Sequence, residues 1–295
     1  MSETGWPPGR APVAVVMIAL NEAHNMEAVL ENLAGWAQEV FLVDSLSRDD
    51  TVDIALRHGV HVVQRPFRGF GDQWNFAMAA LPITAPYTMK LDPDERLSEP
   101  LKDGIVAAIE RGGWDGLSCQ RRLWFMGRPL PIREPILRVW KTGACRFSDV
   151  SVNEHPIVEG VIERIDADIE HHDSPDLDHW FDKQNRYATA EAINAFTRAP
   201  MAAEPRLFGG ALERRMWLKQ ALRGLPMLHH LLFFYYWLWR GLWRAGSVGY
   251  IAARLWSEKW RNRQFKLAEM RLTGRLPIER TDGTGEPDPR VRQYD

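Results

Sequence analysis

Short apolar runs alternate with helical patterns through the first third of the chain. Residues 13–20, VAVVMIAL, are continuously apolar and rich in β-branched side chains, which is typical of a strand buried on both faces of a parallel sheet. Similar runs follow at 40–43, 61–63 and 87–91, and helical spacing separates them at 26–36, 49–56 and 74–80. This alternation predicts an α/β fold with a mostly parallel sheet flanked by helices.

The pattern becomes less regular after the next helical stretch, at 97–109. Strand-like pieces at 116–120, 136–140 and 161–165 are separated by Gly and Pro, and they predict a mixed extension of the sheet. A further helix is expected at 177–196, and Pro200 and Pro205 mark a boundary after it.

Four segments follow from these patterns. Residues 1–11 have no basic stretch followed by an apolar one, so they are interpreted as a disordered lead-in and not as a signal peptide. The α/β domain is expected at 12–200, a basic, Trp-rich helical region at 201–280, and a flexible tail at 281–295. The two cysteines of the 295 residues are too few for a disulfide framework, and they indicate a reducing compartment.

Acidic side chains follow two of the predicted strands. Asp92 and Asp94 come directly after the strand at 87–91, and Asp44 ends the strand at 40–43. Ligands of parallel sheets bind beyond the carboxyl ends of the strands. Asp92 and Asp94 can share Mg²⁺ or Mn²⁺, which prefer oxygen ligands, although a solvated turn would also explain the pair. Asp44 can accept hydrogen bonds from a nucleobase or ribose, or serve only in the turn.

Three arginines are candidates for binding phosphate, because a guanidinium offers two parallel donors. Arg138, in LRVW, is the best of them, and ordinary ion pairs explain Arg121 and Arg122 equally well. The loop Gly69-Phe70-Gly71 lacks the Lys-Ser/Thr of a phosphate-binding loop and the spacing of a dinucleotide fingerprint. It is interpreted as a flexible loop near the ligand, which Asn75 helps to orient unless it only caps the next helix.

The order of these signals resembles the family 2 glycosyltransferases, which have a GT-A fold. The matching segments include ALNE at 19–22, VDS at 43–45, SRDDT at 47–51, GFGDQWNFA at 69–77, LDPDE at 91–95, LRVW at 137–140, VNEH at 152–155, and His171, Lys183, Asn185, Arg186 and Tyr187. The resemblance covers about residues 12–195 and is closest to the branch that extends lipopolysaccharide cores and related surface glycans. The chain departs from the usual pattern at Leu46 and Asp50, where Gly is common, and at Asn153, where His is common.

The resemblance implies that residues 12–200 are a GT-A catalytic domain that binds a nucleotide-sugar donor. Its expected donor contacts are Leu20, Asn21, Glu22, Asp44, Asn75, Asp92 and Arg138. Its expected metal ligands for Mg²⁺ or Mn²⁺ are Asp94, Asp92 and His171. A loop histidine without a ligand role explains His171 equally well. The metal would neutralise the charge that builds on the departing diphosphate.

The resemblance also implies inversion at the anomeric carbon, which requires a general base facing the acceptor. Glu154, in VNEH, is the first candidate, and Asp149, in FSDV, is the alternative. A surface carboxylate or ion-pair partner would explain either residue.

The C-terminal region differs from the rest of the chain in charge. The whole chain has a formal net charge of −2, yet residues 206–280 hold 15 Lys/Arg and only 4 Asp/Glu, together with 6 of the 13 tryptophans. Nucleic acid is not expected as a partner, because the run LLFFYYWLW at 231–239 favours a membrane surface. The 16 uncharged residues between Arg223 and Arg240 are too few for a spanning helix, so interfacial helices are expected. The alternative is a helical cap that packs on the α/β domain or on another subunit.

The expected function is therefore transfer of a hexose from a UDP-type donor to a lipid-linked glycan. Lipopolysaccharide core is the first choice of glycolipid acceptor, and a polyprenyl-phosphate, capsule or exopolysaccharide acceptor is the alternative. A nucleotidyltransferase is disfavoured because ALNEAHN lacks a Gly-rich basic signature. A membrane scaffold with an inactive transferase domain is the non-enzymatic alternative. The expected location is the cytoplasmic face of the inner membrane, as a peripheral or monotopic protein, and a homo-oligomer stays open.

Overall fold

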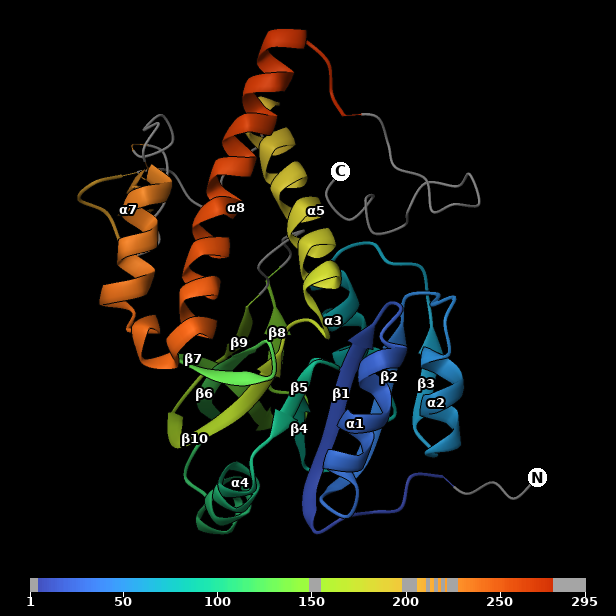
Figure 1. Ribbon diagram of the computed structural model, residues 1–295. Helices are drawn as coiled ribbons and strands as arrows, with labels where there is room; N and C mark the ends of the chain where they lie inside the picture. The colour runs from blue at the N-terminus through green and yellow to red at the C-terminus, as the bar shows by residue number, and fades with distance from the viewer. Residues whose placement is uncertain are drawn as a thin grey trace. The chain divides into compact units, whose positions relative to one another are not determined.

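The chain forms two compact units, which are described separately below. The computed structural model describes residues 5–148, 155–197, 206–210, 213–214, 217–218, 221 and 228–277. The first unit extends to Pro175, and the second begins at Asp176 (Figure 1). The expected α/β domain ended at residue 200, so this boundary moves the helix that follows Asp176 into the second unit.

The first unit alternates strands and helices as the sequence pattern predicts. Its helices are α1 (Ala23–Leu33), α2 (Thr51–Arg57), α3 (Phe70–Ala80) and α4 (Glu99–Arg111). Its strands are β1 (Ala11–Ala19), β2 (Ala37–Asp44), β3 (His61–Gln64), β4 (Tyr87–Lys90), β5 (Glu95–Leu97), β6 (Gly116–Phe125), β7 (Arg128–Lys141), β8 (Cys145–Phe147), β9 (Pro156–Val158) and β10 (Ile162–His172).

Eight strands make one sheet in the order β3-β2-β1-β4-β7-β6-β10-β5. The pairs β1–β2, β1–β4, β2–β3 and β6–β10 are parallel, whereas β4–β7, β6–β7 and β5–β10 are antiparallel. The prediction of a mostly parallel sheet with a mixed extension is confirmed. The sequence pattern did not predict β5 or the small sheet formed by β8 and β9.

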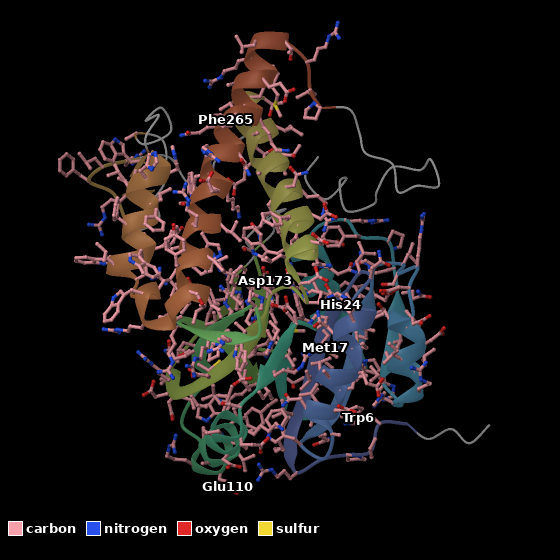
Figure 2. All side chains as sticks on the ribbon, in the orientation of Figure 1. Trp6, Met17, His24, Glu110, Asp173 and Phe265 are labelled. Carbon is pink, nitrogen blue, oxygen red and sulfur yellow. The ribbon has the colours of Figure 1, made fainter. Side chains whose placement is uncertain are left out.

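Both faces of the sheet are covered, which explains why β1 is apolar at every position. Val13, Val15 and Met17 lie in one core with α1, α2 and α4, and Ala14 and Val16 lie in the other with α3 and β8 (Figures 1 and 2). Alternate residues of a strand face opposite sides, so only a continuous apolar run satisfies both cores. This packing holds the carboxyl ends of β1, β2 and β4 at one edge.

The segment before β1 is ordered from the first described residue onward. Trp6 is buried and its indole Nε1 donates to the Ala37 carbonyl at 3.0 Å, while the Gly9 amide donates to the same carbonyl at 2.8 Å. These contacts correct the expectation of a disordered lead-in for residues 5–11. Residues 1–4 lie outside the described residues.

The second unit is helical where it is described. It contains α5 (Leu177–Phe196), α7 (Leu228–Phe234), a π-helical turn at Tyr235–Trp239, a 3₁₀ turn at Leu242–Ala245 and α8 (Gly246–Thr273). Helices α5 and α8 pack through Ala192, Ala195, Leu267 and Met270, and the Arg263 guanidinium lies 3.1 Å from the Glu191 carboxylate. None of the helices in the described residues is long and apolar enough to cross a membrane.

Candidate functional site

The predicted acidic residues lie at one edge of the sheet, on either side of β1. In the β1–β2 register, Ala19 pairs with Asp44 at the end of β2. In the β1–β4 register, Val16 pairs with Lys90, two residues before Asp92. Both neighbours run parallel to β1, so their carboxyl ends open on the same side, where a ligand of such a sheet binds.

Side chains from the loop after β2 and from the first residue of α2 accept hydrogen bonds from the amides at the start of α1. The Asn21 amide donates to Ser47 Oγ at 2.8 Å, the Glu22 amide to Thr51 Oγ1 at 2.8 Å and the Ala23 amide to Asp49 Oδ2 at 3.1 Å. In return, the Arg48 amide donates to Asn21 Oδ1 at 2.8 Å. The loop thus caps a helix start from a distance, because the first amides of a helix have no intrahelical acceptor. The expected base contacts of Leu20, Asn21 and Glu22 stay a prediction.

The Asp44 carboxylate is fully buried and organises the same loop. It accepts hydrogen bonds from the Ser47 amide at 2.9 Å, from the Ser47 hydroxyl and from Gln64 Nε2 at 2.9 Å. Leu46, which lies between Asp44 and Ser47 in the sequence, has a φ of 66°, in the left-handed region that favours glycine. A nucleobase would reach Asp44 only after the Ser47 hydroxyl or the Gln64 amide turned away. The predicted base contact therefore stays a prediction.

Glu95 closes the turn that carries Asp92 and Asp94. Its amide donates to the Asp92 carbonyl at 2.9 Å, and its Oε2 accepts from the Asp92 amide at 3.1 Å. The other oxygen, Oε1, accepts from Arg138, whose guanidinium also lies 3.2 Å from Asp92 Oδ2. Both Glu95 and Arg138 are buried. The charge of Arg138 is thus shared between two carboxylates, and its predicted contact with a donor phosphate stays a prediction.

The pKa values of this group reflect burial opposed by charge. Burial raises the pKa of Glu95, and Arg138 beside it acts in the opposite direction. The pKa of Asp92 is lowered: burial acts to raise it, but Lys90 and Arg138 together outweigh that effect. The Glu95 and Asp92 carboxylates in turn raise the pKa of Arg138 against the effect of burial. Asp92 is therefore held ionised, and its side chain keeps 35% exposure toward solvent.

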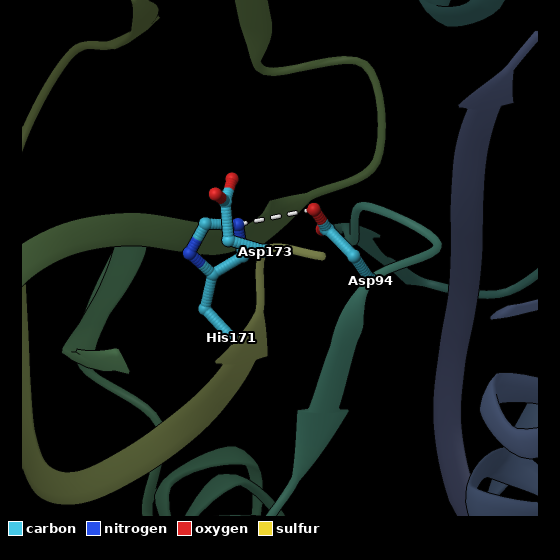
Figure 3. Close-up of side chains that lie close together, drawn as sticks. All are labelled: Asp94, His171 and Asp173. Carbon is cyan, nitrogen blue, oxygen red and sulfur yellow. Dashed lines mark hydrogen bonds and ion pairs between the residues drawn. The ribbon is translucent and has the colours of Figure 1, made fainter. Parts of the chain in front are cut away.

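Three side chains in this unit are close enough to share a metal ion. Asp94, His171 and Asp173 each offer one ligand atom, and these atoms all lie within 4.8 Å of one another (Figure 3). His171 Nε2 lies 3.1 Å from Asp94 Oδ2, and the His172 amide donates to the Asp94 carbonyl at 2.8 Å. The cluster forms because β10 pairs antiparallel with β5, which places His171 opposite Glu95.

The chemistry of these atoms fits a divalent cation. Two carboxylates and one imidazole supply oxygen and nitrogen donors, and His171 Nδ1 is buried without a hydrogen-bond partner. The pKa of His171 is raised: burial lowers it, but the Asp94 carboxylate outweighs burial. Asp92 lies outside this cluster, with its carboxylate turned to Arg138, so its predicted ligand role stays a prediction.

Asp173 is the member of the cluster that the sequence analysis missed. It follows the predicted histidine by two residues in the segment His171-His172-Asp173. Side chains two residues apart on an extended chain point to the same side. The spacing of two residues from His171 could therefore have identified Asp173 as a candidate metal ligand from the sequence.

Asn75 has a different environment from the expected one. Its Nδ2 donates to the Phe147 carbonyl at 3.1 Å, and its Oδ1 accepts from the Phe147 amide at 2.8 Å. Asn75 therefore fastens α3 to the end of β8, and its predicted contact with the donor stays a prediction. Asp149 and Glu154, the candidate bases, lie outside the described residues. Phe147 and Pro156, on either side of them, pair across the β8–β9 sheet.

The comparisons with known proteins agree with this arrangement. The family model described as glycosyl transferase family 2 matches residues 14–146, which include most of β1, all of β2 to β4, and Asp44, Asp92 and Asp94. These residues form a family 2 glycosyltransferase domain. The family 2 resemblance is thereby confirmed over these residues. The lipopolysaccharide branch stays a prediction.

The relatives of this family 2 domain match it over part of their length. A protein of Rickettsia felis described as an uncharacterized glycosyltransferase is 33% identical over 117 residues, which cover 39% of the chain and 41% of that protein. An uncharacterized glycosyltransferase of Mycobacterium bovis is 34% identical over 111 residues, which cover 37% of the chain and 49% of that protein. The match thus spans less than half of either relative.

Two solved structures are similar to this chain, both with TM-scores below 0.5. Glucosyl-3-phosphoglycerate synthase from Mycobacterium tuberculosis, in complex with Mn²⁺, UDP and phosphoglyceric acid, is 27% identical, with a TM-score of 0.31, over 38% of this chain and 44% of that chain. A structure of S. aureus TarS is 15% identical, with a TM-score of 0.44, over 93% of this chain and 98% of that chain.

Removal of the buried arginine should destabilise the first unit. We expect Arg138→Leu to lower its free energy of unfolding by about 3–5 kcal/mol, because Glu95 would lose its counter-charge without gaining water. Glu95 would then stay protonated in the folded unit while the unfolded chain loses the proton first. The pKa of Glu95 is already raised in the wild type, and loss of Arg138 should raise it further. The difference between variant and wild type should therefore be small in acid, where Glu95 is protonated in both proteins, and grow as the pH rises through the range in which only the wild-type residue ionises. Urea unfolding at several pH values measures it.

Arg133→Leu is the control for this variant, since Arg133 also pairs with a carboxylate, Asp168 at 2.8 Å, but is largely exposed. Its loss should stay within about 1 kcal/mol. Equal losses for the two variants would contradict the role assigned to Arg138.

Replacement of Asp173 in the cluster of Asp94, His171 and Asp173 should weaken metal binding. We expect Asp173→Asn to lower the affinity for Mn²⁺ by about tenfold or more, because a neutral amide oxygen replaces a charged ligand. Titration calorimetry with Mn²⁺ alone measures the effect. Asp166→Asn, at an exposed position of β10, the strand that precedes Asp173, should bind as the wild type does. Unchanged affinity in Asp173→Asn would remove Asp173 from the ligand set.

Proposed function

We propose that this protein is an inverting glycosyltransferase that moves a hexose from a UDP-type donor to a lipid-linked glycan. The observation that carries the proposal is the cluster of Asp94, His171 and Asp173 beside Asp92, at the carboxyl edge of a family 2 sheet. A divalent cation at such an edge is suited to a diphosphate ligand.

The donor side of the reaction follows from the charges at this edge. A sugar that leaves a nucleoside diphosphate adds negative charge to the β-phosphate. Bound Mg²⁺ or Mn²⁺ would supply the neutralising charge. Asp94, His171 and Asp173 would hold this ion, and the half-buried Asp92 carboxylate, kept ionised by Lys90 and Arg138, would contact the donor next to it. The buried turn closed by Glu95 keeps these carboxylates in place before the donor arrives.

The acceptor side requires a base, and Glu154 is proposed for it, with Asp149 as the alternative. Support comes from the residues around them. Asn75 fixes Phe147, and the Ser148 amide donates to the His155 carbonyl at 3.3 Å, so both ends of segment 149–154 are anchored to the first unit. A base on this segment would take the proton of the attacking hydroxyl.

Lipopolysaccharide core is the proposed acceptor, at the cytoplasmic face of the inner membrane. Support comes from the charge contrast between the acidic first part of the chain and the basic, Trp-rich region 206–280. Basic and aromatic side chains together favour the surface of an anionic bilayer, where a glycolipid acceptor is presented.

A thermal-shift screen of nucleotide sugars, with and without Mn²⁺, tests the proposed function. A UDP-sugar should raise the melting temperature in a Mn²⁺-dependent manner, since a ligand that binds only the folded state stabilises it. The same donor should then be consumed when a rough-type lipopolysaccharide extract is added. Failure of every nucleotide sugar to bind would contradict the proposal, and metal-dependent binding without turnover would favour the scaffold alternative.

Replacement of the proposed base should separate binding from chemistry. We expect Glu154→Gln to keep the Mn²⁺-dependent thermal shift and to lose transfer by about 100-fold or more, the usual contribution of a general base. Asp149→Asn, in the same segment, should retain most of the activity. The reverse ranking of the two variants would assign the base to Asp149.

A further inference from the structure

The segment from α7 through the π-helical turn exposes a continuous line of large apolar side chains. Leu231, Phe234, Tyr235, Leu238 and Trp239 are 61%, 56%, 42%, 60% and 84% exposed. Their spacing of three, one, three and one residues places them on one side of a helix. The residues between them are less exposed. We call these five residues, with the 51% exposed Trp243 just beyond, the aromatic face.

The opposite side of the same segment is also apolar and packs on α8. The ring of Phe233 lies 5.6 Å from that of Tyr250, Trp237 lies 5.5 Å from Tyr250, and Tyr236 lies 5.4 Å from Trp256, measured between centroids. The segment is therefore hydrophobic all round, with one side satisfied inside its own unit. A helix of this kind needs a second apolar environment for its other side.

The formal charges nearest the aromatic face in the sequence are positive. From Leu228 to Ala253 the chain contains Arg240 and Arg244 but no Asp or Glu. The next arginine, Arg254, lies over the Phe233 ring on the side that packs on α8 and pairs with Glu258 at 3.4 Å. The Arg244 guanidinium lies 5.3 Å from the Trp243 ring centroid, so a cation lies next to an aromatic ring at this position. Tryptophan and tyrosine next to arginine are the side chains found at the headgroup level of membranes. The complementary surface is therefore negatively charged with an apolar interior.

We propose that the aromatic face lies in the headgroup region of an anionic lipid bilayer. This proposal deepens, and rests on, the membrane location proposed above. Large exposed apolar patches mark interaction sites, whereas single exposed apolar residues are ordinary. Two exposed apolar residues of α8 are of the single kind, Phe265 (labelled in Figure 2) and Leu272. Charged residues flank both of them in the sequence: Arg261, Lys266, Glu269 and Arg271. The proposed membrane contact is therefore the aromatic face and not these positions of α8.

A second copy of the chain fits this face less well. Most dimers are symmetric, so the same patch would meet itself. Arg240 and Arg244, which adjoin the aromatic face in the sequence, would then be brought toward their own copies, which is unfavourable for like charges. An anionic lipid surface supplies charge of the opposite sign.

Vesicle flotation of the full chain tests the proposal. The probes are vesicles of phosphatidylcholine alone and vesicles that also contain phosphatidylglycerol. The wild type should float with the anionic vesicles and much less with the neutral ones. The triple variant Phe234→Ser, Leu238→Ser, Trp239→Ser should lose binding to the anionic vesicles by about 100-fold or more, because three buried apolar contacts are removed together.

The matched control is the double variant Phe265→Ser, Leu272→Ser, which removes exposed apolar area from α8 and should float as the wild type does. Circular dichroism and the melting temperature establish that both variants are folded. Flotation of the triple variant at the wild-type level, equal loss in the control, or no flotation of the wild type would each overturn the proposal. So would a wild-type dimer that the triple variant converts to a monomer without any change in flotation.

These outcomes are independent of sugar transfer. A triple variant that no longer floats but keeps its Mn²⁺-dependent nucleotide-sugar shift would support the surface and leave the donor site intact. Loss of donor binding in the Asp173→Asn variant with flotation unchanged would bear on the donor site alone.

Discussion

A carboxylate shielded from water, that of Glu95, holds the candidate site in shape. One of its oxygens accepts from the backbone amide of Asp92 and the other from Arg138, which is itself buried. Each buried charge depends on the other, because an isolated charge inside a protein is strongly unfavourable. The turn that presents Asp92 and Asp94 is therefore positioned by the interior of the domain and not by the ligand.

The neighbouring loops at this edge are held by side chains in the same way. Ser47, Asp49 and Thr51 satisfy the first amides of α1, and Asp44 in turn orders Ser47. Within this polar loop, side-chain oxygens accept hydrogen bonds from backbone amides that would otherwise have to bond to water. The edge of the sheet can expose a few carboxylates to a ligand while the backbone that carries them stays fixed. Preorganisation of this kind is what stabilisation of a developing charge requires.

The two units place different demands on apolar side chains. In the first unit they fill cores on both faces of a sheet, and the exposed positions there are scattered. In the second, alanines of α5 pack against Leu267 and Met270 of α8, while the large apolar residues of segment 228–239 either pack on α8 or are exposed. The proposed anionic membrane surface would complement both the basic charge of this region and its exposed aromatic residues.

The sequence by itself determined the order of strands and helices and the location of acidic residues at strand ends, because periods of two and 3.6 and the rule for parallel sheets are local. Only the tertiary structure decided that Arg138 neutralises Glu95, that Asn75 holds Phe147, and that Asp173 joins Asp94. These partners are far apart in the sequence, and strand pairing and helix packing bring them together. The same holds for the tail: its apolar composition is visible in the sequence, but which side of the helix meets α8 and which side is left exposed depends on packing.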